Sequence, residues 1–450
     1  MSTQPKILEL NAFDMRSTAG LDPDTARLVE RRRRTFGPTS MLFYKRPLNV
    51  VRAEGVWLYE ADGTRVLDAY NNVPSIGHCH PAVVAAVSRQ IGILNIHTRY
   101  LYDGVYTYAE RLLATLPSEL SNIVFTCTGS ESADFALRAV RGLTGGTGFI
   151  VTANAYHGNT SAVTEVSPSS ASAEPRPPHV AVIPAPDTYR WGIDGLSQSF
   201  AGHVRTAIDE LSSRGIKLAG FMADSIFSSD GVYPGEGGFL KEAVDAVRAA
   251  GGLYIADEVQ PGFGRTGGHM WGFERHGVIP DIVIMGKPMG NGFPMGGVVI
   301  KPDLLADFGN RAGYFNTFGG NPVAAAAGLA VLETLQSEGL QQNAHETGQY
   351  LRDQIAAVGK GTAQIGDVRG AGLYIGVECV TGDDAKSPNP VLADQLVNAM
   401  RERGVLIGTA GINGNILKIR PPLAFRRDHA DIFLEAFAAS IRSSHKGSFR

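Results

Sequence analysis

The sequence predicts an α/β protein with a large domain on a mostly parallel sheet and a smaller α+β domain. From about residue 80 to 325, short apolar or β-branched runs alternate with helical stretches. This alternation is typical of parallel strands joined by crossover helices. After about residue 340, longer helical stretches combine with only short strand-like runs. A chain of 450 residues is long enough for both domains.

The first predicted elements lie before residue 80. Asp22-Pro23-Asp24 predicts the start of a helix, which Gly37-Pro38 ends shortly after Thr35, and the sequence before residue 22 is irregular. Residues 50–70 predict short antiparallel strands with a turn at Asp62-Gly63. We assign residues 1–79 to an N-terminal segment of the small domain, 80–325 to the large domain and 326–450 to the C-terminal small domain.

Strands of the large domain are predicted where apolar runs are short and bounded by turn residues. They cover residues 123–126, 149–152, 180–183, 221–223, 253–256 and 282–285. An alanine-rich helix over 323–336 follows, and short strands around 372–378 and 416–419 belong to the small domain. Residues 167–178 are of low complexity, which predicts a mobile surface loop.

Composition limits the classes of function. The 41 Lys and Arg residues nearly balance the 44 Asp and Glu residues, so a general nucleic-acid binder is disfavoured. Three cysteines are too few for a disulfide framework. The N-terminus lacks the apolar core of a secretion signal, and no apolar run is long enough to span a membrane. We therefore expect a cytoplasmic protein without nucleic-acid or membrane partners.

Two conspicuous motifs have a plain structural interpretation. The run from Arg31 to Arg34 lies at the end of the first predicted helix, where the helix dipole favours solvated cations, and we prefer this reading to a nucleic-acid patch. His78-Cys79-His80 has metal-ligand side chains but no distant second pair. We interpret it as a turn before a helix that opens at Pro81, and we expect no metal.

Residues with chemical potential follow the ends of the predicted strands, where doubly wound sheets bind ligands. Gly129 and Ser130 open a helix, an arrangement that binds phosphate. Tyr156 supplies an aromatic ring, Asp257 a strand-end carboxylate and Lys287 a strand-end lysine. A solvated loop lysine is the plain alternative, but a buried lysine with these neighbours fits an imine-forming nucleophile. Together these parts predict a site for pyridoxal phosphate.

The chain also resembles a known family over about residues 40 to 440. Asp257-Glu258-Val259-Gln260 followed by Gly262-Phe263-Gly264-Arg265, and Met285-Gly286-Lys287, resemble the class III pyridoxal-phosphate-dependent aminotransferases of fold type I. The resemblance implies a seven-stranded-type sheet, pyridoxal 5′-phosphate as cofactor and a homodimer with shared active sites. It further implies Lys287 as the imine-forming lysine, Asp257 as the partner of the pyridine nitrogen, Gln260 at the ring hydroxyl, Val259 and Tyr156 on the ring faces, Gly129 and Ser130 at the phosphate, and Thr317 at the phosphate of a neighbouring subunit.

Two positions depart from the aminotransferase pattern. Ser229 stands where those enzymes carry a gating glutamate, and Lys418 stands where they carry an arginine for the substrate carboxylate. Arginine clamps a carboxylate with two hydrogen bonds, whereas lysine is a point charge. The exchange weakens the case for an amino-acid and keto-acid pair, while a lysine still suits a phosphate.

The departures indicate the phospho-lyase branch of this family, whose members act on O-phosphoethanolamine or 5-phosphohydroxylysine. The stretches that resemble this branch include Asn71-Asn72-Val73, Pro186-Asp187-Thr188-Tyr189-Arg190 and Lys418-Ile419 with Pro421-Pro422. The resemblance implies elimination of phosphate from O-phosphoethanolamine, which yields acetaldehyde and ammonia. The candidate ligands of the substrate phosphate are Lys418 and Arg420, with Arg46 and Arg99 as weaker candidates. An ω- or diamine-type aminotransferase and a cofactor-bound protein without turnover are the alternatives.

Overall fold

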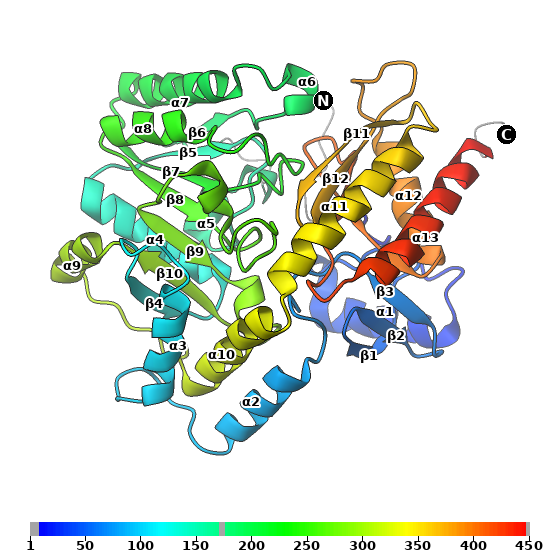
Figure 1. Ribbon diagram of the computed structural model, residues 1–450, viewed down its shortest axis with the longest axis horizontal. Helices are drawn as coiled ribbons and strands as arrows, with labels where there is room; N and C mark the ends of the chain where they lie inside the picture. Colours follow the sequence, from blue (N-terminus) through cyan, green and yellow to red (C-terminus); the bar gives the residue numbers. More distant parts are fainter. Residues whose placement is uncertain (1–8, 171–175, 447–450) are drawn as a thin grey trace.

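The computed structural model describes residues 9–170 and 176–446. Its largest sheet has seven strands in the order β4-β10-β9-β8-β7-β5-β6 (Figure 1). In chain order these are β4 (Asn122–Thr126), β5 (Gly148–Thr152), β6 (Val180–Ile183), β7 (Leu218–Asp224), β8 (Leu253–Asp257), β9 (Ile282–Met285) and β10 (Gly296–Ile300). Strands β6, β5, β7, β8 and β9 are mutually parallel, and β10 is antiparallel to both of its neighbours. The predicted α/β fold with a mostly parallel sheet is confirmed.

Helices cover both faces of this sheet. Helices α7 (Leu196–Ser213) and α8 (Lys241–Ala249) pack on one face, and α4 (Gly129–Thr144) packs on the other. Successive side chains of a strand point to opposite faces. Accordingly, Tyr254 and Ala256 of β8 belong to one buried cluster while Ile255 belongs to the other. This double coverage leaves only the strand ends of the sheet for binding.

Strand β10 is absent from the sequence-based prediction. Its first two residues, Gly296 and Gly297, have low β propensity, which hides the strand in the sequence. The structure explains Gly296, because a Cβ atom there would lie 2.6 Å from Thr126 Oγ1 and 2.7 Å from the carbonyl oxygen of Thr128. The glycine therefore lets β10 lie against the turn that begins α4. The six strands that were predicted all form within a few residues of their expected ends.

The N-terminal segment shares a sheet with the C-terminal segment. Strands β1 (Val50–Glu54), β2 (Trp57–Glu60) and β3 (Arg65–Asp68) are antiparallel, as predicted, and β3 pairs in parallel with β13 (Val405–Leu406). Helix α1 (Pro23–Phe36) precedes them, and its N-cap Asp22 accepts a hydrogen bond from the Thr25 amide. The domain boundaries at residues 79/80 and 325/326 stay predictions.

A third sheet has the order β11-β12-β15-β14. Its strands are β11 (Ile365–Ala371), β12 (Tyr374–Cys379), β14 (Gly408–Ala410) and β15 (Ile416–Ile419). The strand predicted around 372–378 is confirmed as β12, which begins two residues later because Gly372 has a φ of +53° and lies in the turn between β11 and β12. Helices α11 (Leu340–Gly359), α12 (Pro390–Glu402) and α13 (Arg427–Lys446) lie beside this sheet (Figure 1).

The remaining helices connect these parts. They are α2 (Pro81–Ile91), α3 (Asp103–Leu113), α5 (Ser161–Glu165), α6 (Thr188–Trp191), α9 (Pro302–Arg311) and α10 (Pro322–Ser337). The predicted alanine-rich helix is confirmed as α10, which packs against α2 and α3. His80 caps α2 at Pro81, which confirms the turn predicted there. None of the helices within the described ranges is long and apolar enough to cross a membrane.

The predicted surface loop over 167–178 is partly wrong. Ser167 and Ser169 are buried, and the Ser169 hydroxyl donates a hydrogen bond to the carbonyl oxygen of Ala155. The polar composition reflects these internal hydrogen bonds and not solvent exposure alone. Residues 171–175 of this segment and residues 1–8 of the predicted irregular N-terminus lie outside the described residues.

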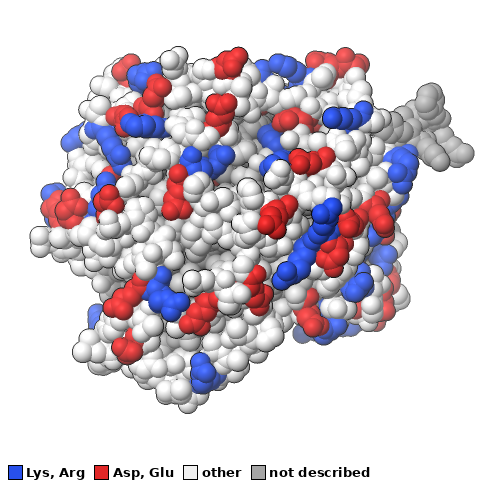
Figure 2. Space-filling view, viewed as in Figure 1, with Lys and Arg blue, Asp and Glu red and all other residues white. Residues whose placement is uncertain are grey.

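The visible surface carries charges of both signs. Figure 2 shows Lys and Arg side chains interspersed with Asp and Glu side chains on this face. This mixture agrees with the near balance of charges in the sequence.

Candidate active site

A cavity of about 110 Å³ lies at the carboxyl ends of β8 and β9. Asp257 is the last residue of β8, and Lys287 follows β9 by two residues. The cavity is lined by Thr128, Gly129, Ser130, Tyr156, His157, Gly158, Asp224, Asp257, Val259, Gln260 and Lys287. Every residue that the sequence predicted for the cofactor, except Thr317, therefore lines one cavity.

One end of the cavity is formed by backbone groups at the start of α4. The Thr128 hydroxyl caps the helix by accepting a hydrogen bond from the Glu131 amide at 3.1 Å, and a helix start leaves further first-turn amides without partners inside the helix. Gly158 lies close by with a φ of +148°, and a Cβ atom there would lie 2.7 Å from Ser130 Oγ. The Asn159 amide donates to the same oxygen at 3.2 Å. This close approach of two backbones forms an anion cradle.

The opposite end of the cavity holds a buried carboxylate. Asp257 Oδ2 lies 2.6 Å from His157 Nδ1, and Asp257 Oδ1 accepts a hydrogen bond from the Val259 amide at 3.0 Å. His157 is itself held by its backbone amide, which donates to Ser167 Oγ at 3.0 Å. No role was predicted for His157 from the sequence. Its position between Tyr156 and Gly158, in the loop that follows a predicted strand, is the signal that could have identified it.

Lys287 lies among groups that perturb its protonation. Removal from solvent, and secondarily the Arg420 guanidinium, lowers the pKa of the Lys287 amine to about 8. Burial and the charge of Asp257 raise the pKa of the Asp224 carboxyl to about 6. Perturbed pKa values that cluster in a cavity are typical of catalytic sites. Asp224 is a second residue that sequence reasoning did not select.

A second cavity of about 140 Å³ adjoins the first and shares Tyr156, Gln260 and Lys287 with it. Its other lining residues are Leu10, Asn11, Phe43, Tyr70, Ser229, Thr409, Lys418 and Arg420. Lys287 therefore lies where the two cavities meet. The structure brings both leading candidates for a substrate phosphate, Lys418 and Arg420, to the second cavity.

The two cations of the second cavity are held differently. Arg420 Nη1 donates hydrogen bonds to Asn72 Oδ1 at 2.7 Å and to Gln260 Oε1 at 2.6 Å. Lys418 is only 4% exposed, and no carboxylate of the described residues forms an ion pair with it. Burial, followed by the charge of Arg420, lowers the pKa of the Lys418 amine well below its usual value. A buried amine without an ion-pair partner gains a favourable charge when an anion binds beside it, because the anion stabilises the protonated form.

Gln260 links the two cavities through its side-chain amide. Its nitrogen donates to Ser228 Oγ at 2.8 Å, and its oxygen accepts from Arg420 and from the Tyr374 hydroxyl at 3.0 Å. These contacts fix the amide in place. The role that the sequence predicted for Gln260, at a ring hydroxyl, stays a prediction.

Comparison with known proteins gives consistent matches over most of the chain. The model of the aminotransferase class-III family matches residues 43–441. The chain belongs to the class III aminotransferase family. An alanine–glyoxylate aminotransferase 2-like protein of Drosophila melanogaster is 39% identical, over 91% of this chain and 85% of the relative. An ethanolamine-phosphate phospho-lyase homolog 1 of Caenorhabditis elegans is 35% identical, over 89% of this chain and 90% of the relative.

Solved structures also match over most of the chain. A phospholyase from Arthrobacter in complex with phosphoethanolamine has a TM-score of 0.90 and 43% sequence identity, and the match covers 92% of this chain and 99% of that chain. An aminotransferase of Bacillus anthracis has a TM-score of 0.84 at 25% identity, over 93% and 99% of the two chains. The matches to this chain therefore include proteins named as a phospholyase and as aminotransferases.

Pyridoxal phosphate is the cofactor of this class III family, and the first cavity fits it. The cradle brings backbone close to the cavity, since a Cβ atom at Gly158 would lie 2.7 Å from Ser130 Oγ and one at Gly129 would lie 3.1 Å from Val259 Cγ2. The amides at the start of α4 are suitable donors for a phosphate. Tyr156 and Val259 line the cavity between this cradle and Asp257. The carboxylate suits a protonated ring nitrogen, and the Lys287 amine suits an aldehyde carbon.

Three candidate residues lie away from both cavities. Thr317 and Arg46 are exposed. Arg99 lines a separate cavity of about 450 Å³, where its guanidinium carbon lies 3.8 Å from the centre of the Phe315 ring. The predicted role of Thr317, at the phosphate of a neighbouring subunit, stays a prediction.

Proposed function

We propose that this class III family member is a pyridoxal-phosphate-dependent lyase that eliminates phosphate from O-phosphoethanolamine. The observation that carries the proposal is the second cavity, in which the unpaired amine of Lys418 and the guanidinium of Arg420 lie beside Lys287. A substrate whose amine reaches Lys287 would place a phosphate on the adjacent carbon within this cationic cavity. The phosphoethanolamine named for the Arthrobacter neighbour has this shape and charge.

Each side chain has a separate role in the proposed reaction. When bound, pyridoxal phosphate supplies an electron-accepting ring that stabilises negative charge on the substrate carbon next to nitrogen. The Lys287 amine accepts the proton from that carbon, for which the lowered pKa of about 8 is favourable near neutral pH. His157 orients the Asp257 carboxylate toward the ring nitrogen. Lys418 and Arg420 stabilise the negative charge on the departing phosphate.

The same cavity is poorly suited to a keto acid. The family's carboxylate-binding arginine is replaced by Lys418, and its gating glutamate is replaced by Ser229, which lines the cavity. Arg420 also lines this cavity, but its Nη1 atom already donates to Asn72 and Gln260, so no arginine stands at the position from which the family clamps a carboxylate. These two positions favour a reaction without an amino acceptor.

A class III aminotransferase is the second candidate. The observation that favours it is the identity of 39% to a relative named alanine–glyoxylate aminotransferase 2-like. The cofactor cavity serves both reactions, so the two functions differ only in the second cavity. The two candidate functions are distinguished by whether turnover requires a keto acid.

Phosphate release decides between the two candidates. Purified, cofactor-loaded protein is supplied with O-phosphoethanolamine in the absence of any keto acid, with Lys287→Ala as the inactive control. We expect phosphate, ammonia and acetaldehyde in equal amounts. Amine consumption that requires pyruvate or glyoxylate, with no phosphate released, would refute the lyase and support the aminotransferase. The same assay with 5-phosphohydroxylysine compares the two phosphorylated amines.

We further propose that the protein is a homodimer. Large apolar side chains are exposed before α3 and around Thr317, with Leu101 90% exposed and Phe318 70% exposed. The two segments touch, since the His97 and Phe315 rings pack edge to face with centroids 5.8 Å apart. Exposed apolar patches of this kind mark protein interfaces. A cytoplasmic location is part of the same proposal, although three relatives are named as mitochondrial.

A further inference from the structure

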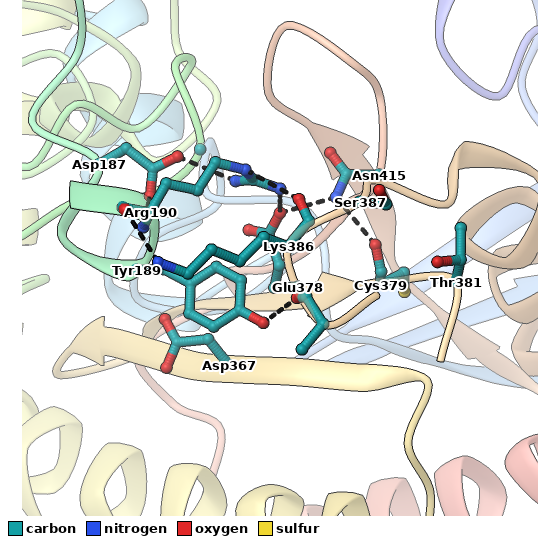
Figure 3. A network of polar contacts seen from close by, with 12 residues as sticks. Asp187, Tyr189, Arg190, Asp367, Glu378, Cys379, Thr381, Lys386, Ser387 and Asn415 are labelled. Carbon is teal, nitrogen blue, oxygen red and sulfur yellow. Dashed lines mark hydrogen bonds and ion pairs between the residues drawn. The ribbon is translucent and has the colours of Figure 1, made fainter. Parts of the chain in front are cut away.

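A buried carboxylate next to the second cavity joins two arginines. Figure 3 shows Glu378 of β12 with Arg190 and Asn415 directed toward it. Arg190 Nη2 donates to Glu378 Oε1 at 2.6 Å, and Asn415 Nδ2 donates to the same oxygen at 2.7 Å. Arg369 Nη2 donates to the other oxygen, Oε2, at 2.8 Å. Glu378 is fully buried, so these three groups provide its solvation.

Charges alternate along this cluster. Arg190 also pairs with Asp187 at 2.9 Å, and Arg369 pairs with Asp367 at 3.0 Å. The cluster therefore connects the segment after β6 with two strands of the third sheet. The Pro186-Asp187-Thr188-Tyr189-Arg190 stretch, which resembles the phospho-lyase branch, supplies one end of it. The loop after β12 covers this end, because Lys386 Nζ donates to the Arg190 carbonyl oxygen at 3.0 Å.

Arg369 connects this cluster to a turn with a strained backbone. Its Nε donates to the carbonyl oxygen of Val232 at 2.9 Å, and its Nη2 donates to that of Gly231 at 2.8 Å. Val232 has a φ of +61°, which is unfavourable for a β-branched residue. Such a conformation persists only where its surroundings fix it. Arg369 is therefore a principal restraint on this turn.

The turn packs against Gly376, the cross-strand partner of Lys418. Across the third sheet, Arg369 pairs with Gly376, which in turn pairs with Lys418. Residues that are paired in this way point to the same face of the sheet. A Cβ atom at Gly376 would lie 3.0 Å from Val232 Cβ, so the glycine makes room for the turn next to the lysine.

We infer that Glu378 is a positioning residue for the second cavity. It orients Arg369 onto the carbonyl oxygens of Gly231 and Val232 and thereby holds residues 229–232 against the strand that carries Lys418. Ser229, at the start of this turn, forms one wall of the second cavity. Its carbonyl oxygen has two other partners, Asn154 and Gly411, so loss of Glu378 loosens the wall without removing it.

The consequence for substrate binding rests on the proposed function, but the positioning itself does not. A loosened wall misplaces Ser229 relative to Lys418, which weakens binding of the substrate phosphate more than it slows the proton transfer at Lys287. We therefore expect Glu378→Gln to raise KM for O-phosphoethanolamine by about threefold to tenfold, with a smaller change in kcat.

Two variants and one matched control test the inference. Glu378→Gln keeps the shape of the side chain but removes its charge. Arg369→Lys keeps a positive charge but cannot donate to the carbonyl oxygens of both Gly231 and Val232. It is the alternative test variant if Glu378→Gln folds poorly. The control is Glu60→Gln, because Glu60 of β2 forms a comparably buried pair with Arg401 of α12, at 2.7 and 2.8 Å.

Amide hydrogen exchange of the cofactor-loaded protein measures how stably the turn is folded, and it needs no substrate. In the turn, the amides of Gly231 and Val232 donate to the Phe227 carbonyl oxygen and the Tyr233 amide donates to that of Ile226. We expect these amides to exchange faster in Glu378→Gln or Arg369→Lys than in the wild type and in Glu60→Gln. Equal exchange in all proteins, or equal acceleration by the control, would overturn the positioning role.

Steady-state kinetics of phosphate release distinguish the positioning role of Glu378 from the proposed lyase function. If the turn exchanges faster and KM rises only in the Glu378 and Arg369 variants, the inference is supported. If KM is unchanged while wild-type protein releases phosphate, the link from the turn to substrate binding is overturned. Wild-type protein that releases no phosphate refutes the proposed function, and the exchange experiment then decides the positioning role by itself.

Discussion

Replacement of Lys418 by methionine should weaken function without weakening the fold. Lys418 is 4% exposed, and the described residues provide no carboxylate in contact with its amine. Arg420 and Lys287 are its cationic neighbours, and both disfavour its charged form. Methionine has a similar length and no charge, so Lys418→Met removes an unpaired buried amine. We expect the melting temperature to stay constant or to rise.

Although Lys418→Met should not destabilise the fold, it should weaken binding of the substrate. A hydrogen bond to a charged group contributes about 1.5–3 kcal/mol, which corresponds to a rise in KM of roughly 10- to 150-fold for a phosphorylated substrate. Phosphate release at varied O-phosphoethanolamine concentrations measures KM, and differential scanning calorimetry measures the melting temperature.

A matched control is available in the large domain. Lys301 is also partly buried, but its amine lies 2.6 Å from Asp281 Oδ1. Lys301→Met should therefore lower the melting temperature and leave KM unchanged. An unchanged KM in Lys418→Met would exclude Lys418 as a phosphate ligand. A melting temperature that falls as far as in Lys301→Met would show that the Lys418 amine is satisfied in the folded protein, contrary to the reasoning above.

Three further predictions concern the cofactor cavity. Gly158→Ala places a Cβ atom 2.7 Å from Ser130 Oγ, so pyridoxal phosphate affinity, titrated by absorbance, should fall at least about tenfold, and unchanged affinity would exclude the cradle. His157→Phe removes the 2.6 Å contact to Asp257 and should lower kcat by about 10- to 100-fold while the cofactor stays bound; a wild-type kcat would exclude the orienting role. Lys287 reacts with added cofactor only as the neutral amine. Because its pKa is about 8, the rate of cofactor capture by cofactor-free protein should increase with pH up to that region and then level off, and a rate still rising above about pH 10 would contradict the lowered pKa.

Much of the first cavity could be predicted because its residues directly follow regular strands. The carboxyl ends of β8 and β9 lie at one edge of the sheet, so Asp257 and Lys287 had to lie near each other once those strands were recognised. The strands themselves are continuous apolar runs that are buried on both faces, which gives a clear sequence signal.

The features that escaped prediction depend on contacts between distant parts of the chain. Strand β10 begins with two glycines whose small size is required by the neighbouring turn and not by the strand. His157 acts through Asp257, which lies a hundred positions away in the sequence, and a histidine has no periodic signal of its own. The Glu378 cluster likewise draws on three separate segments. Such pairings are decided by tertiary structure, which local propensity does not encode.

The pairing of β3 with β13 has a consequence for the order of folding. These strands come from opposite ends of the chain, and Asn11 likewise contacts Thr409 at 2.9 Å. Contacts between such distant residues form slowly, because a long loop must close first. The second cavity, which includes residues from both ends, is therefore expected to be among the last parts to assemble. During refolding, cofactor binding should return before phosphate release, and during synthesis the site is complete only after residue 420 has left the ribosome.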